Sequence, residues 1–113
     1  MTSQTISLNL IPNGIQPVIH VSQNDKGQTW TFKLMVGKDA FTIPASSTVK
    51  LQGTNSDGTT FNKACTYSGN TVTVDVAEDM TACAGKTKAE IRIEKENDAI
   101  GTQNFIIEVE KQP

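Results

Sequence analysis

The most regular feature of the sequence is an alternation of apolar and polar residues in short runs. The run TWTFKLMV at residues 29–36 places large apolar side chains at every second position. Side chains of a β-strand point alternately to opposite faces, so this period predicts a strand with one buried face. Similar alternation recurs in residues 6–10, 49–53, 71–76, 88–94 and 104–110. Helical spacing almost never appears, and the chain is therefore predicted to be all-β.

Turn-forming residues separate the predicted strands. They are Pro12-Asn13-Gly14, Asn24-Asp25-Lys26-Gly27, Gly37-Lys38-Asp39, Asn55-Ser56-Asp57-Gly58, Ser68-Gly69-Asn70 and Asn97-Asp98. Less regular extended segments are expected at 18–21, at 65–67 and at 41–43, where Pro44 lacks an N–H and limits the segment to an edge strand or a connector. Residues 77–84 are compatible with one short helical turn. Seven to eight antiparallel strands, with turns about every ten residues, predict an immunoglobulin-like β-sandwich.

The alternation also predicts which side chains fill the space between the two sheets. The expected core residues are Trp30, Phe32, Leu34, Val72, Val74, Ile91, Ile93, Phe105 and Ile107. Residues 88–94 and 104–110 are expected to form a terminal hairpin. The 113 residues correspond to one domain. We therefore expect a single β-sandwich domain over residues 1–113, with its core within residues 6–109 and short tails at both ends.

Two apolar residues, Met35 and Ile106, fall on the outward side of otherwise polar strand faces. Each is either covered by a loop or part of a contact surface, because exposed apolar side chains ringed by polar ones are typical of interfaces. The candidate interface consists of Met35, Ile106, Thr31, Lys33, Asn104 and Glu108. The residues from 29–36 share one face. Those of the terminal strand either lie beside them or form a separate small patch.

Charge and composition exclude several classes of partner. The net charge is −2 and the isoelectric point is near 5.3, whereas nucleic-acid binding needs clustered Lys and Arg. No run approaches the roughly 18 apolar residues of a membrane span, and the start lacks the pattern of a signal peptide. We therefore expect neither nucleic acid nor membrane as a partner, and a cytosolic origin. Cys65 and Cys83 are then expected to be free thiols.

The residues that could carry chemistry are few. His20 is the only histidine and is expected to be half-buried in a strand, so a hydrolase would depend on this one residue. Glu78 and Asp79 are adjacent acids in a polar turn, which usually means charges at a helix end. Asp57 and Asp98 lie in turns without the spacing of a calcium loop. The sequence therefore predicts no catalytic residue, no cofactor and no metal site, and the protein is not expected to be an enzyme.

The chain resembles a known phage family in several segments. The run KAEIRIEKEN at 88–97, followed by IGTQNFIIEV at 100–109, resembles the end of the N-terminal domain of phage baseplate upper proteins of Gram-positive hosts. Residues 23–27 with the strand 29–36 are similar to the family's Gln-Gly-Asp segment, with Asn24 in place of its usual glycine. Residues 49–51 and 56–59 are similar to its Pro-Asp-Gly hairpin, with Ser56 in place of the proline. Residues 77–84 occupy the position of its short helical connector.

The resemblance implies a non-enzymatic structural protein that anchors a fibre or receptor-binding arm to a tail baseplate. Its partners would be other phage virion proteins, including further copies of itself as a homo-oligomer, and its location the virion, assembled in the bacterial host cytoplasm. Family members usually continue into a long shaft, whereas this sequence ends at Pro113. A head-fibre or capsid-decoration subunit is therefore an alternative. A carbohydrate-binding module is a further one and would rely on Trp30 and Tyr67.

Overall fold

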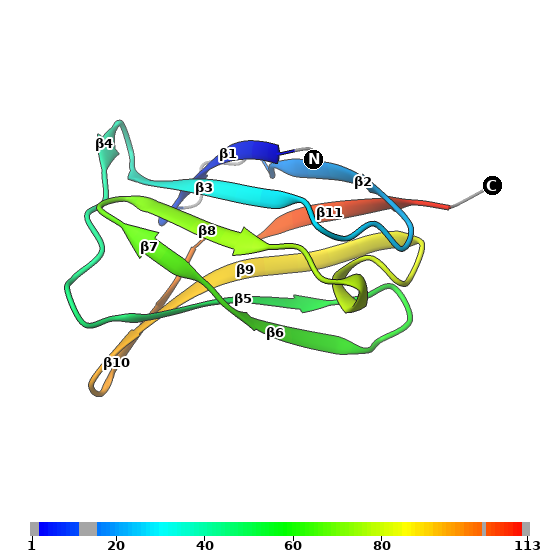
Figure 1. Ribbon diagram of the computed structural model, residues 1–113. Coiled ribbons are helices and arrows are strands. Elements are labelled where there is room, and N and C mark those ends of the chain that lie inside the picture. Colours follow the sequence, from blue (N-terminus) through cyan, green and yellow to red (C-terminus); the bar gives the residue numbers. More distant parts are fainter. Residues whose placement is uncertain (1–2, 12–15, 103, 112–113) are drawn as a thin grey trace.

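The fold consists of two β-sheets packed face to face. The computed structural model describes residues 3–11, 16–102 and 104–111. The first sheet has the strand order β1 (Ser3–Asn9), β3 (Thr29–Val36), β8 (Thr71–Asp75) and β7 (Thr66–Ser68), with β4 (Asp39–Ala40) paired to β3. The second has the order β2 (Val18–Ser22), β11 (Phe105–Glu110), β9 (Gly85–Lys95), β5 (Thr48–Thr54) and β6 (Thr60–Ala64), with β10 (Asp98–Gly101) paired to β9. Figure 1 shows the two layers. The predicted all-β sandwich is confirmed, and its helical turn is a 3-10 turn at Glu78–Met80.

The strands differ from the expectation in number and in two of their directions. The described residues contain eleven strands rather than seven to eight. The additional strands include β4 and β10, which form because tight turns fold the chain back on β3 and β9; Gly37 and Glu96 at these turns have positive φ. The edge strands β1 and β2 pair in parallel with β3 and β11, whereas the expectation was antiparallel throughout. Residues 41–43 are a connector rather than an edge strand.

Each long side of the sandwich is bordered by two edge strands that are consecutive in the chain. At one side β1 is the edge of the first sheet and β2 the edge of the second. The Gln4 side chain joins them, since its Nε2 donates to the backbone oxygen of His20 at 3.0 Å. At the other side the chain leaves β6 at the edge of the second sheet and enters β7 at the edge of the first, with only Cys65 between them.

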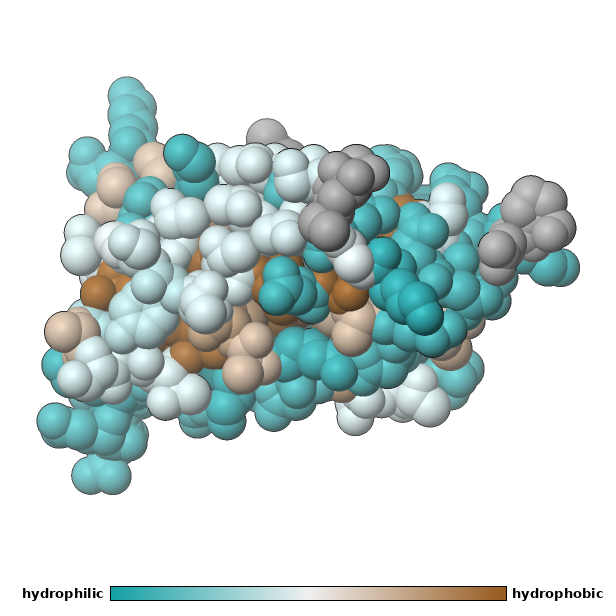
Figure 2. All heavy atoms as spheres, viewed as in Figure 1, coloured by the Kyte–Doolittle hydropathy of each residue, from teal (hydrophilic) through white to brown (hydrophobic). Residues whose placement is uncertain are grey.

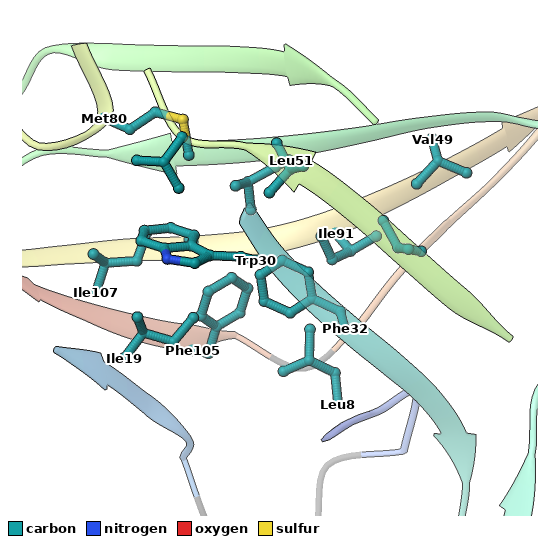
Figure 3. Close-up of a cluster of buried hydrophobic side chains, with 14 of the residues drawn as sticks. Leu8, Ile19, Trp30, Phe32, Val49, Leu51, Met80, Ile91, Phe105 and Ile107 are labelled. Atoms are coloured by element: carbon teal, nitrogen blue, oxygen red, sulfur yellow. The ribbon is translucent and has the colours of Figure 1, made fainter. Parts of the chain in front are cut away.

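The core between the sheets contains the side chains that the alternation predicted. All nine expected core residues are buried, and Leu8, Leu51 and Met80 join them with no exposed surface. Figure 3 shows the large side chains pointing from both sheets into the same space. Phe32 of the first sheet contacts Phe105 of the second, with ring centroids 5.2 Å apart and planes inclined at 46°. This tilted aromatic pair lies within the contact between the layers.

One core position requires glycine. Gly53 on β5 is paired with Phe61 on β6, and the Phe61 ring occupies the space that a Cβ at residue 53 would need. The aromatic ring therefore covers the glycine and restores the apolar contact that a side chain would have made.

We expect replacement of Phe32 by Ala to lower the free energy of unfolding by about 3–5 kcal/mol, because a fully buried ring is lost and a cavity remains. Urea denaturation followed by tryptophan fluorescence measures this change. Thr31→Ala is the matched control, because Thr31 lies on the outer face of the same strand, and we expect it to cost about 1 kcal/mol or less. Equal losses for the two variants would contradict the assignment of inner and outer faces.

Candidate functional site

The outer face of the first sheet is formed mainly by hydroxyl side chains. Alternation in the four main strands places these residues on it: Ser3, Thr5, Ser7, Asn9, Thr29, Thr31, Lys33, Met35, Thr66, Ser68, Thr71, Thr73 and Asp75. We call this surface the hydroxyl face. Thr31 lies at its centre, between Thr5 of β1 and Thr73 of β8. Its only charged members are Lys33 and Asp75. Figure 2 shows pale residues of intermediate hydropathy over the part of the molecule where β3, β7 and β8 lie.

The outer face of the second sheet is charged. It carries Lys50 of β5, His20 of β2, Glu108 of β11 and a row along β9, namely Lys86, Lys88, Glu90, Arg92 and Glu94. Lys50 and Glu94 form an ion pair of 3.2 Å between Nζ and Oε1. His20 is exposed, and the expectation of a half-buried histidine was wrong. The reason is that Ile19 and Val21 take the buried positions of β2, which turns His20 to the outside.

The six predicted interface residues divide between these two outer faces. Thr31, Lys33 and Met35 lie on the outer side of β3. Ile106 and Glu108 lie on the outer side of β11, and Asn104 is exposed just before that strand. The structure therefore does not bring the two sets together in one patch.

Met35 and Ile106 are each half-buried on their strands. Met35 lies between Asn9 of β1 and Ala40 of β4, so neighbouring strands flank it on both sides. Ile106 is flanked by Lys88 of β9 and Val18 of β2. Met35 is thus shielded at one end of the hydroxyl face, whereas Ile106 has an apolar neighbour.

Val18 was missed by the sequence analysis. It is 44% exposed and is the cross-strand partner of Ile106, so the two form an apolar pair on the charged face. We call Val18, Asn104, Ile106 and Glu108 the β11 patch. The sequence does indicate that Val18 is exposed, because the alternation of β2 places it on the side of the strand opposite to Ile19 and Val21. Its pairing with Ile106 depends on strand order, which the alternation does not determine.

The charged face also contains a shallow groove of about 380 Å³. Gln52, Gly53, Asn62, Ala89 and Glu90 are among the residues that line it. Among the described residues, no group of three or more His, Cys, Asp or Glu side chains is placed to hold a metal ion. No described helix is long and apolar enough to cross a membrane.

The loop after β2 is fixed to the 3-10 turn by a network of hydrogen bonds. The Asn24 N–H donates to the Thr81 oxygen at 2.9 Å, and the Thr81 hydroxyl donates to the Asp25 oxygen at 2.6 Å. The Asp25 carboxylate accepts from Gln28, whose amide oxygen accepts from the indole N–H of Trp30. The loop therefore links the core to the turn at this end of the sandwich.

Asn24 has a φ of 67°, in the left-handed region where glycine has no steric penalty. Asparagine tolerates this conformation better than other residues with a Cβ. The conformation accounts for asparagine at the position where the resembling family usually has glycine.

The hairpin between β5 and β6 is stabilised by Asn55, whose buried side chain is hydrogen-bonded through both its nitrogen and its oxygen. Its amide donates to the Thr59 hydroxyl at 3.1 Å, and its amide oxygen accepts from the buried Thr87 hydroxyl at 3.1 Å. The Asp57 carboxylate accepts from both the backbone N–H and the hydroxyl of Thr59, which lowers the pKa of Asp57. These hydrogen bonds stabilise the turn between the two strands.

Both cysteines are free thiols. Burial raises the pKa of Cys65 to about 11. A hydrogen bond with the Asp57 carboxylate, together with some desolvation, raises the pKa of Cys83. A raised pKa keeps a thiol protonated near neutral pH, and the protonated thiol is a poor nucleophile. Neither cysteine therefore has the properties of a reactive residue.

Comparison with known structures supports the architecture. The N-terminal domain of phage TP901-1 ORF48 superposes with a TM-score of 0.79 at 11% sequence identity, and the match covers 98% of this chain and 100% of that one. At this identity the likeness concerns the fold alone. No curated protein matches the chain.

The fold defines a domain of the two-sheet β-sandwich class. The sequence matches the BppU N-terminal domain family over residues 2–113. The chain therefore belongs to the family of N-terminal domains of baseplate upper proteins, as its resemblance indicated. Membership in this family gives it a structural role in the phage.

We expect Asn24→Ala to lower the free energy of unfolding by about 1–2 kcal/mol, because alanine is strained at a positive φ. Asn24→Gly is the matched variant, because it also lacks the amide group of asparagine, and glycine adopts a positive φ without strain. We expect it to be more stable than Asn24→Ala in urea denaturation. Equal stability of the two variants would show that the side chain of Asn24, and not its backbone conformation, determines the preference.

The thiol of Cys65 should react slowly in the native protein. A rise of its pKa from 9.0 to about 11 lowers the thiolate fraction at pH 8 about 100-fold. The greater nucleophilicity of a more basic thiolate recovers part of this, so alkylation by iodoacetamide should be at least about tenfold slower than in urea. Mass spectrometry of peptides containing Cys65 measures the rate. A native rate equal to the rate in urea would contradict the burial of this side chain.

Proposed function

We propose that the domain is a non-enzymatic anchoring module that docks on another virion protein of the baseplate. Membership in a baseplate family over residues 2–113 supports this function more than any other single observation. Assembly would take place in the cytoplasm of the bacterial host. The baseplate family favours a position in the tail over the alternative of a head-fibre or capsid-decoration subunit.

The β11 patch is the docking surface that we favour. Val18 and Ile106 are adjacent apolar side chains, and the rim around them is formed by His20, Glu108 and Lys88. Apolar side chains at the centre of a contact with polar groups around them correspond to the usual anatomy of a protein interface. The outer side of β3, with Thr31, Lys33 and Met35, is the second candidate because it is poor in charge.

The competing functions have less support in the geometry. A carbohydrate-binding module would need exposed aromatic rings, but Trp30 is fully buried, and the half-buried Tyr67 accepts a hydrogen bond from the Ser47 N–H. A hydrolase would need a partner that orients His20. Within the described residues, the imidazole of His20 has no hydrogen-bond partner, and its cross-strand neighbour is Glu108. Docking is therefore the function that the surface supports best.

We expect Ile106→Lys to reduce incorporation of the domain into assembled particles about tenfold, because a charged group at the centre of a contact costs about 1–2 kcal/mol of binding. The assay is competition with the parent protein during assembly, with circular dichroism as the folding control. Ile100→Lys is the matched control, since Ile100 is 42% exposed on β10, away from the patch. We expect it to assemble like the parent.

Two further variants distinguish the candidate surfaces. Val18→Lys should have the same effect as Ile106→Lys, because the two side chains are neighbours. Met35→Lys tests the outer side of β3. If Ile106→Lys and Val18→Lys both assemble like the parent while Met35→Lys does not, the docking surface is on β3 and the β11 patch is not the interface.

A further inference from the structure

The hydroxyl face differs from every other large surface of the described chain in how little charge it carries. Nine of its thirteen residues are Ser or Thr, two are the uncharged Asn9 and Met35, and only Lys33 and Asp75 are charged. Charged groups are costly to remove from water, whereas the methyl group of threonine gains from burial. This face is therefore less costly to dehydrate than the charged face of the second sheet.

A surface of hydroxyl groups is complementary to itself. Each hydroxyl can donate one hydrogen bond and can also accept, so two such faces can satisfy each other in many registers. Patterned charges are more selective, because like charges repel when identical charged surfaces meet. The chemistry of the face thus favours a partner of the same chemistry, and a second copy of the chain provides one.

The two charges select one arrangement of the copies. Lys33 is paired with Thr71, whereas Asp75 is paired with Thr29, so the charges lie at opposite ends of the face. The separation along the strands is four residues, or about 13 Å. Consider a two-fold axis that runs across the strands at the level of Thr31 and Thr73. Rotation about it places Lys33 of each copy beside Asp75 of the other.

We propose that the hydroxyl face packs against the same face of a second copy about this two-fold axis, with Lys33 and Asp75 pairing between the copies. The contact is isologous, since the same residues contribute from both sides. The proposal rests on the proposed function as an association module, and it assigns self-association to the first sheet and leaves the β11 patch free for another protein. The face spans only four short strands, so the contact belongs to the small, weak class of interfaces.

Analytical ultracentrifugation of the purified protein, at concentrations up to about 1 mM, measures the self-association. We expect a reversible monomer–dimer equilibrium. Thr31→Glu should raise the dimer dissociation constant at least tenfold, because the axis passes at residue 31 and brings the two new carboxylates together. Gln52→Glu is the matched control, since Gln52 lies in the middle of a strand on the outer face of the other sheet. It should leave the equilibrium unchanged.

A charge exchange tests the orientation of the two copies. Lys33→Asp and Asp75→Lys should each weaken the dimer about fivefold or more, and the double variant should recover most of the loss, because the double exchange restores opposite charges across the axis. Strictly monomeric parent protein at every concentration would overturn the proposal. A dimer that responds to Gln52→Glu and not to Thr31→Glu, or a double variant as weak as the single ones, would overturn it equally.

The outcome is separable from that of the anchoring function. Docking on another virion protein is measured by incorporation into particles and depends on Ile106 and Val18, whereas self-association is measured on the isolated protein and depends on Thr31, Lys33 and Asp75. A monomeric protein that is still incorporated, and whose incorporation is lost with Ile106→Lys, would refute the self-association and retain the anchoring function.

Discussion

The structure depends on the contact between two sheets whose inner faces carry nearly all of the large apolar side chains. Phe32 and Phe105 meet across this contact, with Trp30 of β3 and Ile91 of β9 also in the core. Because side chains alternate along a strand, each residue that enters the core commits its neighbours to the outside. The composition of the outer faces is therefore a consequence of how the core is filled. The hydroxyl face exists because the apolar positions of β3 and β8 are separated by threonines.

Alternation along the chain was sufficient to predict the strands that have one buried and one exposed face. The segment 29–36 was predicted with the bounds that β3 has, and the nine expected core residues are buried. The sequence of such a strand shows which side chains face the core, since a shift of one residue would expose them. The fold class could be predicted for the same reason.

What the alternation could not supply was the pairing between strands. The parallel direction of β1 and β2, and the placement of Val18 beside Ile106, depend on which strands become neighbours. The short strands β4 and β10 form only because their partners are present. The division of the six candidate residues between opposite faces follows from the same limitation.

The side-chain contact between the edge strands β1 and β2 has a consequence for a protein that is concentrated in an assembly. An open strand edge is a template on which another chain can add a strand, and this is a common route to aggregation. Here the chain passes from sheet to sheet at each side, and the Gln4 side chain occupies the edge carbonyl of His20. One backbone acceptor on the edge of β2 is therefore already occupied by a side chain of the same molecule, which makes this edge a poorer template for a strand of a crowded neighbouring copy.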